Sequence, residues 1–478
     1  MESDILSTNR KALRINLDSS IYGTIAEIGG GQEVARQFFQ AGGASGTVAK
    51  SISAYDKLFS DKLYNKNKPG KYVSEGRLCK MLDAEYTELV SLLTEQREIP
   101  SKYFAFANTV TTLNFNKDNY SHGWMGMRFQ YNPGPDPNEV LLHVHLLEQD
   151  TLLQQQTLGI LGVNLIFACH NFIKNPVDFI LSLMDNISRD RIEITMMRMR
   201  GPDLDYVDNR LLGVQLVKNG MTSAMIFDRR GEVQQPSDML YKKNVLLFRG
   251  AFRPIHYVGF DMLKSSYRIF KRDEDYDRDN TMALCEISVN NLLRKGEIDE
   301  RDFLERVDLL NGMGQNVMIS KFKEYYKLVS YFSQFALKNL RIVIGVPAFM
   351  NIINDKYYSD LRGGILEAFG QIFVENMKVY IYPTIPSVSI DTREAVGELL
   401  TSKDILLSKE QQGLYQYLVT NRKIIDITNV KKEWLYISSA NVLRMIREAE
   451  PGWEKMVPNY IEKEIREKGL FGYKPKAT

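Results

Sequence analysis

The pattern of apolar and polar residues changes character about halfway along the chain. In the first half, residues 12–17 alternate between apolar and polar, which predicts a strand, whereas over 75–97 the apolar residues fall on one face of a helix. From residue 244 onward, short continuous apolar runs alternate with helical patterns. Continuous runs are typical of strands buried on both faces, so the second half predicts a parallel sheet covered by helices.

The first half mixes strands, hairpins and helices, which indicates an α+β domain. Ser74 is the predicted N-cap of the helix over 75–97, and a proline-rich turn is predicted at 132–137. The pair Asn219-Gly220 predicts a hairpin turn. The other predicted elements of this half are strands at 103–107, 124–129, 139–147 and 191–197, a helix at 177–187, and hairpin strands at 211–218 and 222–228.

The polar stretch 228–238 separates the two patterns, so two domains are predicted in this chain of 478 residues. The first is an α+β domain over residues 1–233, whose role the sequence does not indicate, and the second is an α/β domain over 240–478. The predicted strands of the second are 245–248, 283–288, 316–320, 341–345 and 379–382, and its predicted helices are 260–270, 300–310, 321–337 and 361–373.

Composition narrows the class of protein. A net charge of +2 provides no global field for nucleic acid or an anionic membrane, so neither is an expected partner. The three cysteines, Cys79, Cys169 and Cys285, are far apart and odd in number, which argues against a disulfide framework and favours a reducing compartment. The first 18 residues lack an apolar signal region, and the longest apolar run, 158–168, is shorter than the roughly 18–20 residues of a membrane span. We therefore expect a cytoplasmic protein; its oligomeric state is left open.

Three stretches outside the second domain's strands could carry chemistry. The glycines at 29–31 precede a helical pattern, so they could bind an anion or could serve packing and capping alone. His143 and His145 lie two apart on a predicted strand and share a face, where they could bind a metal, exchange protons or form part of an exposed sheet face. The acidic run 273–279 fits a solvated loop or a divalent metal site.

The end of the first strand of the second domain is the strongest candidate site. The apolar run stops at Gly250, and an aromatic residue, a proline and His256 follow before the predicted helix at 260–270. In parallel sheets, ligands bind at the carboxyl ends of strands, where a helix N-terminus offers free N–H groups. An ordinary strand-to-helix turn is the alternative.

Two separated motifs resemble those of one enzyme family. Gly250-x-Phe252-x-Pro254-x-His256 resembles the first signature of the nucleotidylyltransferase superfamily, G-x-F-x-P-x-H/T-x-x-H. Residues 436–444, Tyr-Ile-Ser-Ser-Ala-Asn-Val-Leu-Arg, are similar to the I-S-S-T-x-I-R signature of nicotinamide/nicotinate mononucleotide adenylyltransferases. The closing stretch 447–471, with its Val-Pro and Tyr-Ile, is also similar to that family, and the motifs occur in the family's order.

The resemblance implies a dinucleotide-binding-like nucleotidylyltransferase domain that transfers an adenylyl group from ATP, with Mg²⁺, to a nicotinamide or nicotinate mononucleotide, giving an NAD-type dinucleotide. It assigns the catalytic residues as His256 and Arg444, and the cofactor-binding residues as Gly250, Ala251, Phe252, Arg253, Ser438 and Ser439.

The chain departs from the family pattern at three places. Gly259 stands where a second histidine belongs, Ala440 replaces a threonine, and one extra residue precedes Arg444. Three hypotheses follow: an adenylyltransferase, a catalytically degenerate nucleotide-binding regulatory or scaffold protein, or a protein whose first half is the active part.

Overall fold

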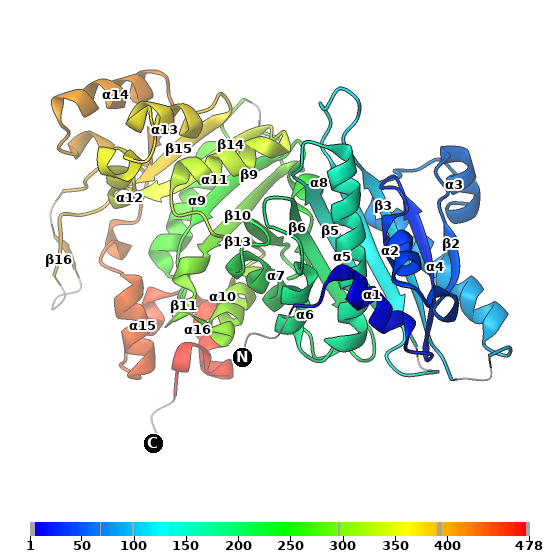
Figure 1. Ribbon diagram of the computed structural model, residues 1–478. Helices are drawn as coiled ribbons and strands as arrows, with labels where there is room; N and C mark the ends of the chain where they lie inside the picture. The colour runs from blue at the N-terminus through cyan, green and yellow to red at the C-terminus, as the bar shows by residue number, and fades with distance from the viewer. Residues whose placement is uncertain are drawn as a thin grey trace. The chain divides into compact units, whose positions relative to one another are not determined.

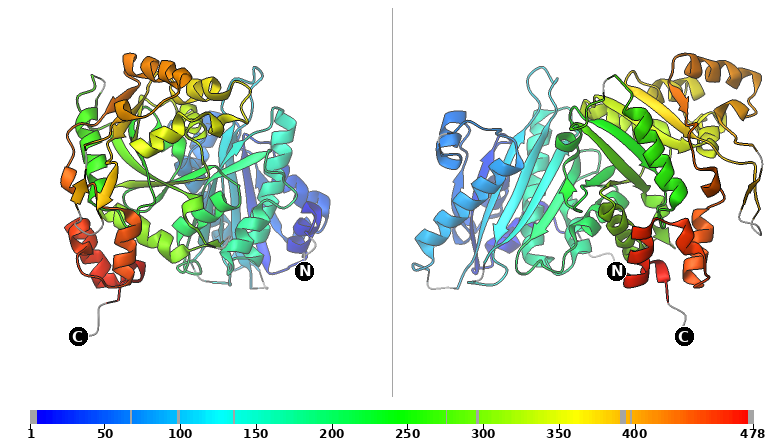
Figure 2. Two further views of the ribbon diagram at one scale, coloured as in Figure 1. Left: turned by 90° about the vertical axis from the view of Figure 1, so that its left-hand side faces the viewer. Right: turned by 180° about the vertical axis from the view of Figure 1, so that it is seen from behind.

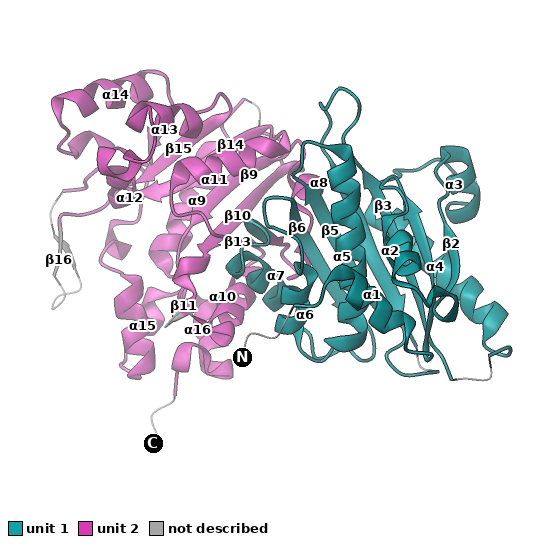
Figure 3. Cartoon of the chain, in the orientation of Figure 1, with its two compact units in different colours: residues 1–225 teal, residues 226–478 magenta. Residues whose placement is uncertain are grey.

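The chain folds into two compact units, shown in different colours in Figure 3: unit 1, residues 1–225, and unit 2, residues 226–478. The computed structural model describes residues 5–66, 68–97, 100–134, 136–274, 276–294, 297–389, 394–396 and 398–474. The division lies slightly before the sequence-based boundary at 233–240. The residues after Met225 continue strand β7 (Ala224–Phe227), which belongs to the second sheet together with β8 (Val233–Gln234).

Unit 1 is built on one six-stranded sheet of order β2-β1-β3-β4-β5-β6, in which β1 is parallel to β2 and β3 and the remaining pairs are antiparallel. Its strands are β1 (Ile21–Ile28), β2 (Val48–Ile52), β3 (Lys102–Thr111), β4 (His122–Phe129), β5 (Asn138–Leu146) and β6 (Ile192–Arg200). Its helices are α1 (Thr8–Asn16), α2 (Glu33–Ala41), α3 (Lys57–Tyr64), α4 (Glu75–Leu93), α5 (Thr151–Asn171), α6 (Pro176–Leu183) and α7 (Asn209–Lys218).

Helices cover both faces of this sheet. Figure 1 shows α5 in front of the strands, and Figure 2 shows α4 on the opposite side. The close approach of α5 to α2 requires glycine, because a Cβ at Gly162 would collide with the side chain of Val34. Helix α5 is long and apolar enough to cross a membrane, but 72% of its most apolar window is buried inside the structure, so it is a core helix.

Two predictions for this half are wrong. Residues 12–16 belong to helix α1 and Leu17 is its C-cap; Ser7 caps the first turn, and the buried residues Ala12, Ile15 and Asn16 recur at helical spacing. A window of six residues is too short to distinguish helical spacing from the alternation of a strand. The predicted hairpin strand 211–218 is helix α7, and Gly220 lies just past its C-terminal end, in left-handed backbone at φ 68°. The helix at 75–97 with Ser74 as its cap is confirmed as α4, and Pro135 of the predicted turn lies outside the described residues.

The described residues of unit 2 form most of an eight-stranded sheet and two two-stranded antiparallel sheets. Its strands beyond β8 are β9 (Asn244–Arg249), β10 (Thr281–Ser288), β11 (Leu293–Arg294), β12 (Glu297–Ile298), β13 (Asn316–Ser320), β14 (Asn339–Gly345), β15 (Met377–Tyr382), β16 (Ser387–Ser389), β17 (Glu394–Val396) and β18 (Ile424–Asp426). Its helices are α8 (Pro236–Leu240), α9 (Tyr257–Phe270), α10 (Glu300–Gly312), α11 (Tyr325–Phe332), α12 (Val346–Ile352), α13 (Gly364–Ile372), α14 (Lys409–Thr420), α15 (Ser439–Arg447) and α16 (Asn459–Lys468).

The predicted parallel sheet is confirmed in unit 2. Strands β13-β10-β9-β14-β15-β18 lie side by side, and every one of these neighbouring pairs is parallel. Numbered along the chain, their order is 3-2-1-4-5-6, which is the order of doubly wound dinucleotide-binding sheets. Helices lie on both faces (Figure 2). The strand order reverses between β9 and β14, so the carboxyl ends of these two strands define the expected ligand crevice.

Candidate functional site

The candidate residues at 250–256 directly follow β9, at the point where the strand order reverses. Residue Gly250 still belongs to the sheet edge, because its N–H donates to the carbonyl of Glu286 on β10 at 3.0 Å. Helix α9 then begins at Tyr257, with His256 as its N-cap. The N–H of Phe260 donates to the His256 carbonyl, so the N–H groups before Phe260 in the first turn have no acceptor within the helix.

Gly250 and Phe252 have a structural explanation. The Phe252 ring is buried and packs edge-to-face on Phe248, with 5.2 Å between centroids. A Cβ at Gly250 would lie 3.0 Å from that ring, so glycine lets the ring fold back over the strand end. The backbone of Phe252 itself is left-handed, with φ of 48°. The loop therefore has a fixed shape that aims the chain into α9.

Arg253 and Ala251 are bound to helix α10. Arg253 forms an ion pair with Asp302, which is also paired with the fully buried Arg306. Arg306 donates to the Ala251 carbonyl at 2.9 Å. The Arg253 guanidinium is thus held by a carboxylate that it shares with Arg306, and the loop is anchored to α10. Asp302 and Arg306 were not predicted as part of the site, because they belong to no recognisable motif.

The two separated motifs meet at His256. Its Nε2 lies 2.8 Å from the Oγ of Ser439, although 183 positions separate the two residues. Ser438 caps α15 by accepting a hydrogen bond from the Asn441 N–H, so Ser439 is the first residue of that helix. The site therefore combines the N-termini of two helices, α9 and α15, with a histidine–serine contact between them.

Contacts along α9 hold the second segment in this position. The ring of Tyr257 stacks on Trp434, with centroids 4.6 Å apart. The carboxylate of the buried Asp261 accepts from the Lys431 N–H at 3.3 Å and from the Tyr382 hydroxyl at 2.7 Å. These bonds attach the stretch before Ser438 to the helix that His256 begins.

His256 is neutral in this setting. Burial lowers its pKa to about 4, so the ring carries no charge at pH 7. Its Nδ1 is buried and has no hydrogen-bond partner among the described residues. If the Ser439 hydroxyl donates to Nε2, then Nδ1 carries the proton and is a donor without an acceptor. Leaving such a group unpaired costs about 1–3 kcal/mol, which a bound acceptor could recover.

Arg444 is turned to other partners. Its guanidinium lies 2.6 Å from Glu448 and 3.0 Å from the second carboxylate oxygen of Glu450, and its side chain is 48% exposed. Ser439 and Arg444 are five positions apart on α15, which places their side chains about 140° apart around the helix axis. The structure thus brings His256 and Ser439 together, whereas Arg444 forms ion pairs with Glu448 and Glu450.

The position of the expected second histidine faces apolar side chains. A Cβ at Gly259 would lie 3.4 Å from Ile255 and 3.7 Å from Phe248, both of which are buried. A side chain there would start against these apolar core residues.

A buried ion pair supports the carboxyl ends of three neighbouring strands. Glu286 of β10 is fully buried and lies 2.6 Å from Nε of Arg249 at the end of β9. The Ser320 hydroxyl of β13 donates to Glu286 at 2.5 Å, and Arg249 donates to the Phe322 carbonyl at 2.9 Å. This network was not predicted, although an acidic residue inside an apolar strand, Glu286, was a signal for it.

The glycine loop of unit 1 is filled by the protein itself. The Glu27 carboxylate accepts from the Val34 and Ala35 N–H groups, each at 3.1 Å, in the first turn of α2. Asn108 donates to the same carboxylate at 3.3 Å. Glu27 therefore takes two of the donors that a phosphate would need, which favours the packing and capping interpretation of residues 29–31.

Glu27 should make the stability of unit 1 depend on pH. Burial raises its pKa to about 7 from 4.5, so the folded state keeps a proton that the unfolded chain releases. The resulting stabilisation is complete below pH 4.5 and is lost as pH rises through 7. Relative to Glu27→Gln, the wild-type free energy of unfolding should fall by about 2.5 kcal/mol between pH 5 and 8.

Urea unfolding can measure this difference through Trp124, in a background where Trp434 and Trp453 are phenylalanine. A difference between wild type and Glu27→Gln that stays constant across this pH range contradicts the buried, protonated carboxyl group.

His143 of β5 lies in a hydrogen-bonded chain with His122 of β4 and Thr195 of β6. His143 is buried, with Nδ1 2.5 Å from the Thr195 hydroxyl and Nε2 2.9 Å from Nδ1 of His122. His145 lies 3.8 Å from Glu193. Within the described ranges no group of three or more His, Cys, Asp or Glu side chains is placed to hold a metal ion.

In the acidic run 273–279, Asp273 pairs with Arg341 at 2.7 Å, and Asp275 lies outside the described residues.

Comparison with known proteins adds little to this geometry. No protein-family model matches the chain, and the search of curated proteins gives no match. One similar solved structure is the crystal structure of competence/damage inducible protein CihA from Agrobacterium tumefaciens, at 15% identity and a TM-score of 0.25. The similarity covers 35% of this chain and 98% of that one. At this TM-score it carries no argument about fold or function.

Proposed function

We propose that unit 2 binds ATP and a nicotinamide or nicotinate mononucleotide at the carboxyl end of β9, and that it transfers an adenylyl group to form an NAD-type dinucleotide. The observation that carries the proposal is the 2.8 Å contact between His256 and Ser439, which joins the two family-like motifs at one place. The strand order, which reverses beside this contact, supports it.

Adenylyl transfer needs positioning and charge neutralisation more than covalent chemistry. The N–H groups of the first turn of α9 would bind phosphate oxygens, and His256 would donate from Nδ1 while the Ser439 hydroxyl donates to its Nε2. Mg²⁺, which mainly binds substrate phosphates and keeps its waters, would supply positive charge. Free thiols at Cys79, Cys169 and Cys285 fit the cytoplasmic setting that is part of this proposal.

A catalytically weakened nucleotide-binding regulatory or scaffold protein is the second candidate. Three observations favour it: Gly259 offers no second histidine, Asp302 engages Arg253, and two carboxylates hold Arg444. Both arginines of the resemblance are then engaged by carboxylates, and the helix N-termini are the donors left unengaged. Such a site would bind a nucleotide and turn it over slowly.

Calorimetric titration of the intact chain with Mg·ATP, mononucleotide and NAD tests binding. We expect measurable heat for Mg·ATP, lost in His256→Ala with Ser439→Ala. No heat from any of the three ligands with the folded chain ends the proposal. If binding occurs, formation of the dinucleotide separates the enzyme from the regulatory protein.

A variant of the acidic pair tests whether Arg444 takes part. Glu448→Gln with Glu450→Gln removes the carboxylates that compete with a phosphate for its guanidinium. If Arg444 is a phosphate ligand, this variant should bind Mg·ATP about tenfold more tightly, equivalent to 1.4 kcal/mol. The control, Glu467→Gln on α16, should leave affinity unchanged. If Glu448→Gln/Glu450→Gln and the control bind Mg·ATP with equal affinity, Arg444 is not a phosphate ligand.

A further inference from the structure

Helix α3 of unit 1 exposes its large apolar side chains to solvent and buries polar ones. A surface helix normally buries its apolar stripe and exposes its polar face. On α3 and the two residues before it, the buried side carries Ser60, Asp61 and Tyr64, each of which makes a hydrogen bond through its side chain. The exposed side carries large apolar residues at helical spacing, namely Tyr55, Leu58, Phe59 and Leu63, with exposed fractions of 75%, 75%, 54% and 45%.

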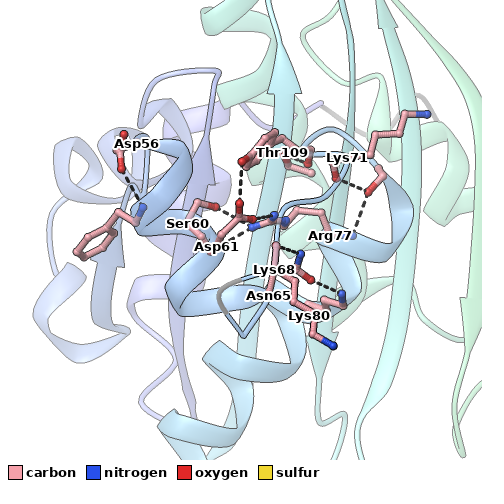
Figure 4. Close-up of polar contacts among 12 residues, drawn as sticks. Asp56, Ser60, Asp61, Asn65, Lys68, Lys71, Arg77, Lys80 and Thr109 are labelled. Carbon is pink, nitrogen blue, oxygen red and sulfur yellow. Dashed lines mark hydrogen bonds and ion pairs between the residues drawn. The ribbon is translucent and has the colours of Figure 1, made fainter.

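A buried ion pair fixes this orientation. Figure 4 shows Ser60 and Asp61 pointing toward Arg77 of α4. Arg77 is 3% exposed, forms an ion pair with Asp61, and donates to the Ser60 hydroxyl at 3.0 Å. The Tyr72 hydroxyl donates to the other Asp61 oxygen at 2.7 Å. Rolling α3 to bury its apolar stripe would leave Arg77 and Asp61 without partners, so the stripe stays outside.

A cavity with matching properties lies beside α3 in the same unit. It has a volume of about 290 Å³ and lies between the edge strand β2 and helix α4. Its wall is apolar at Leu89, Leu92 and Leu93, and Leu92 is 62% exposed. Its polar rim holds Lys50 between Glu85 and Glu88, so the rim carries one more negative than positive charge.

The apolar stripe and the cavity are complementary. Two exposed lysines, Lys57 and Lys62, accompany the apolar stripe, and the cavity combines leucines with a net negative rim. Both surfaces belong to one region, because the Tyr64 hydroxyl at the end of α3 donates to Glu85 of the cavity at 2.7 Å. In a two-fold dimer, the apolar stripe of each copy can pack against the cavity of the other copy, so the same contact forms twice.

We propose that the protein forms a two-fold dimer through unit 1, in which α3 of each chain docks into the cavity between β2 and α4 of the other. The exposed apolar side chains provide roughly 600 Å² per chain, and the rims add to this, compared with about 800 Å² per partner in a standard interface. The dimer would also cover β2, since an uncovered edge strand promotes unwanted pairing.

An anionic membrane is the competing occupant for an apolar surface with lysines. A second copy is favoured because a flat bilayer would leave the cavity unfilled and would meet the carboxylate of Glu88. This proposal is independent of the nucleotide site in unit 2, so either can fail alone.

Sedimentation equilibrium of the full chain tests the dimer. We expect twice the 55.0 kDa of one chain at micromolar concentration. Leu58→Ser with Phe59→Ser should weaken dimerisation at least 100-fold, and because both side chains are exposed, the fold should persist. Leu406→Ser in unit 2, at a residue 98% exposed, is the matched control and should leave the dimer unchanged.

Mixing two defective variants tests the arrangement itself. Leu58→Ser/Phe59→Ser retains the cavity, and Leu92→Asp retains the apolar stripe. In either homodimer both stripe-to-cavity contacts are defective. In the heterodimer, the intact stripe of one chain meets the intact cavity of the other, so one of the two contacts is restored. We expect heterodimers in the mixture. A monomeric wild type, a dimer insensitive to the α3 variant, the absence of heterodimers, or binding of the monomer to phosphatidylserine vesicles would each overturn the proposal.

Discussion

Replacing His256 with alanine should lower adenylyl transfer from Mg·ATP to a mononucleotide by roughly 10²–10³-fold, the usual cost of removing one positioned donor to a developing charge. The reason is that Asp302 and the Glu448–Glu450 pair already engage the nearby arginines. The imidazole and the helix N-termini are then the main groups left for the transferring phosphate. The rate of dinucleotide formation by the purified full chain measures the effect.

Ser439→Ala is the matched comparison for this prediction. It removes the hydroxyl that lies 2.8 Å from the ring but keeps the imidazole, so we expect a smaller loss, about tenfold. Both variants should unfold at the wild-type temperature to within a few degrees. Wild-type activity in His256→Ala would refute the assignment of the histidine to the site.

Glu286→Gln should destabilise unit 2 by about 3–5 kcal/mol, because it leaves the Arg249 charge without its partner inside the fold. Glu286 is fully buried and binds Arg249 and Ser320 at the carboxyl ends of three strands. Urea unfolding in a Trp124→Phe background measures this through Trp434 and Trp453 of unit 2.

Two controls separate this ion pair from general sensitivity to substitution. Replacing both partners, Arg249→Met with Glu286→Leu, should cost much less, because no buried charge remains unpaired. Glu467→Gln breaks an exposed pair on α16 and should change stability by less than about 1 kcal/mol. A loss below 1 kcal/mol in Glu286→Gln would contradict the structural role of the pair.

The sequence predicted the second sheet well because its strands are buried on both faces. A run such as Val245, Leu246 and Leu247, all fully buried, can only belong to a covered strand or helix, and its length decides for a strand. The first half was harder because short windows mislead. Asn219-Gly220 is a strong hairpin signal, yet here it follows a helix that Asp208 caps.

The candidate site was predicted only in part, because motifs give residue types and not their partners. The sequence placed His256 and Ser439 in separate motifs, and contacts such as Tyr257 with Trp434 show how the chain brings them together. It gave no indication that Asp302 would engage Arg253, or that Glu450 would engage Arg444, since those partners depend on helix packing. Glu27, an acidic residue within an apolar strand before a glycine loop, was a signal that could have been used.

Side-chain nitrogen NMR of the histidines tests the nucleotide site most directly, because the chain has only five histidines. Resonances can be assigned with a His256→Gln variant and followed while Mg·ATP is added at pH 7. We predict that the His256 resonances shift and that the pKa of His256, about 4 in the free protein, rises because a phosphate anion favours the charged ring. Unchanged His256 resonances at saturating Mg·ATP would contradict it.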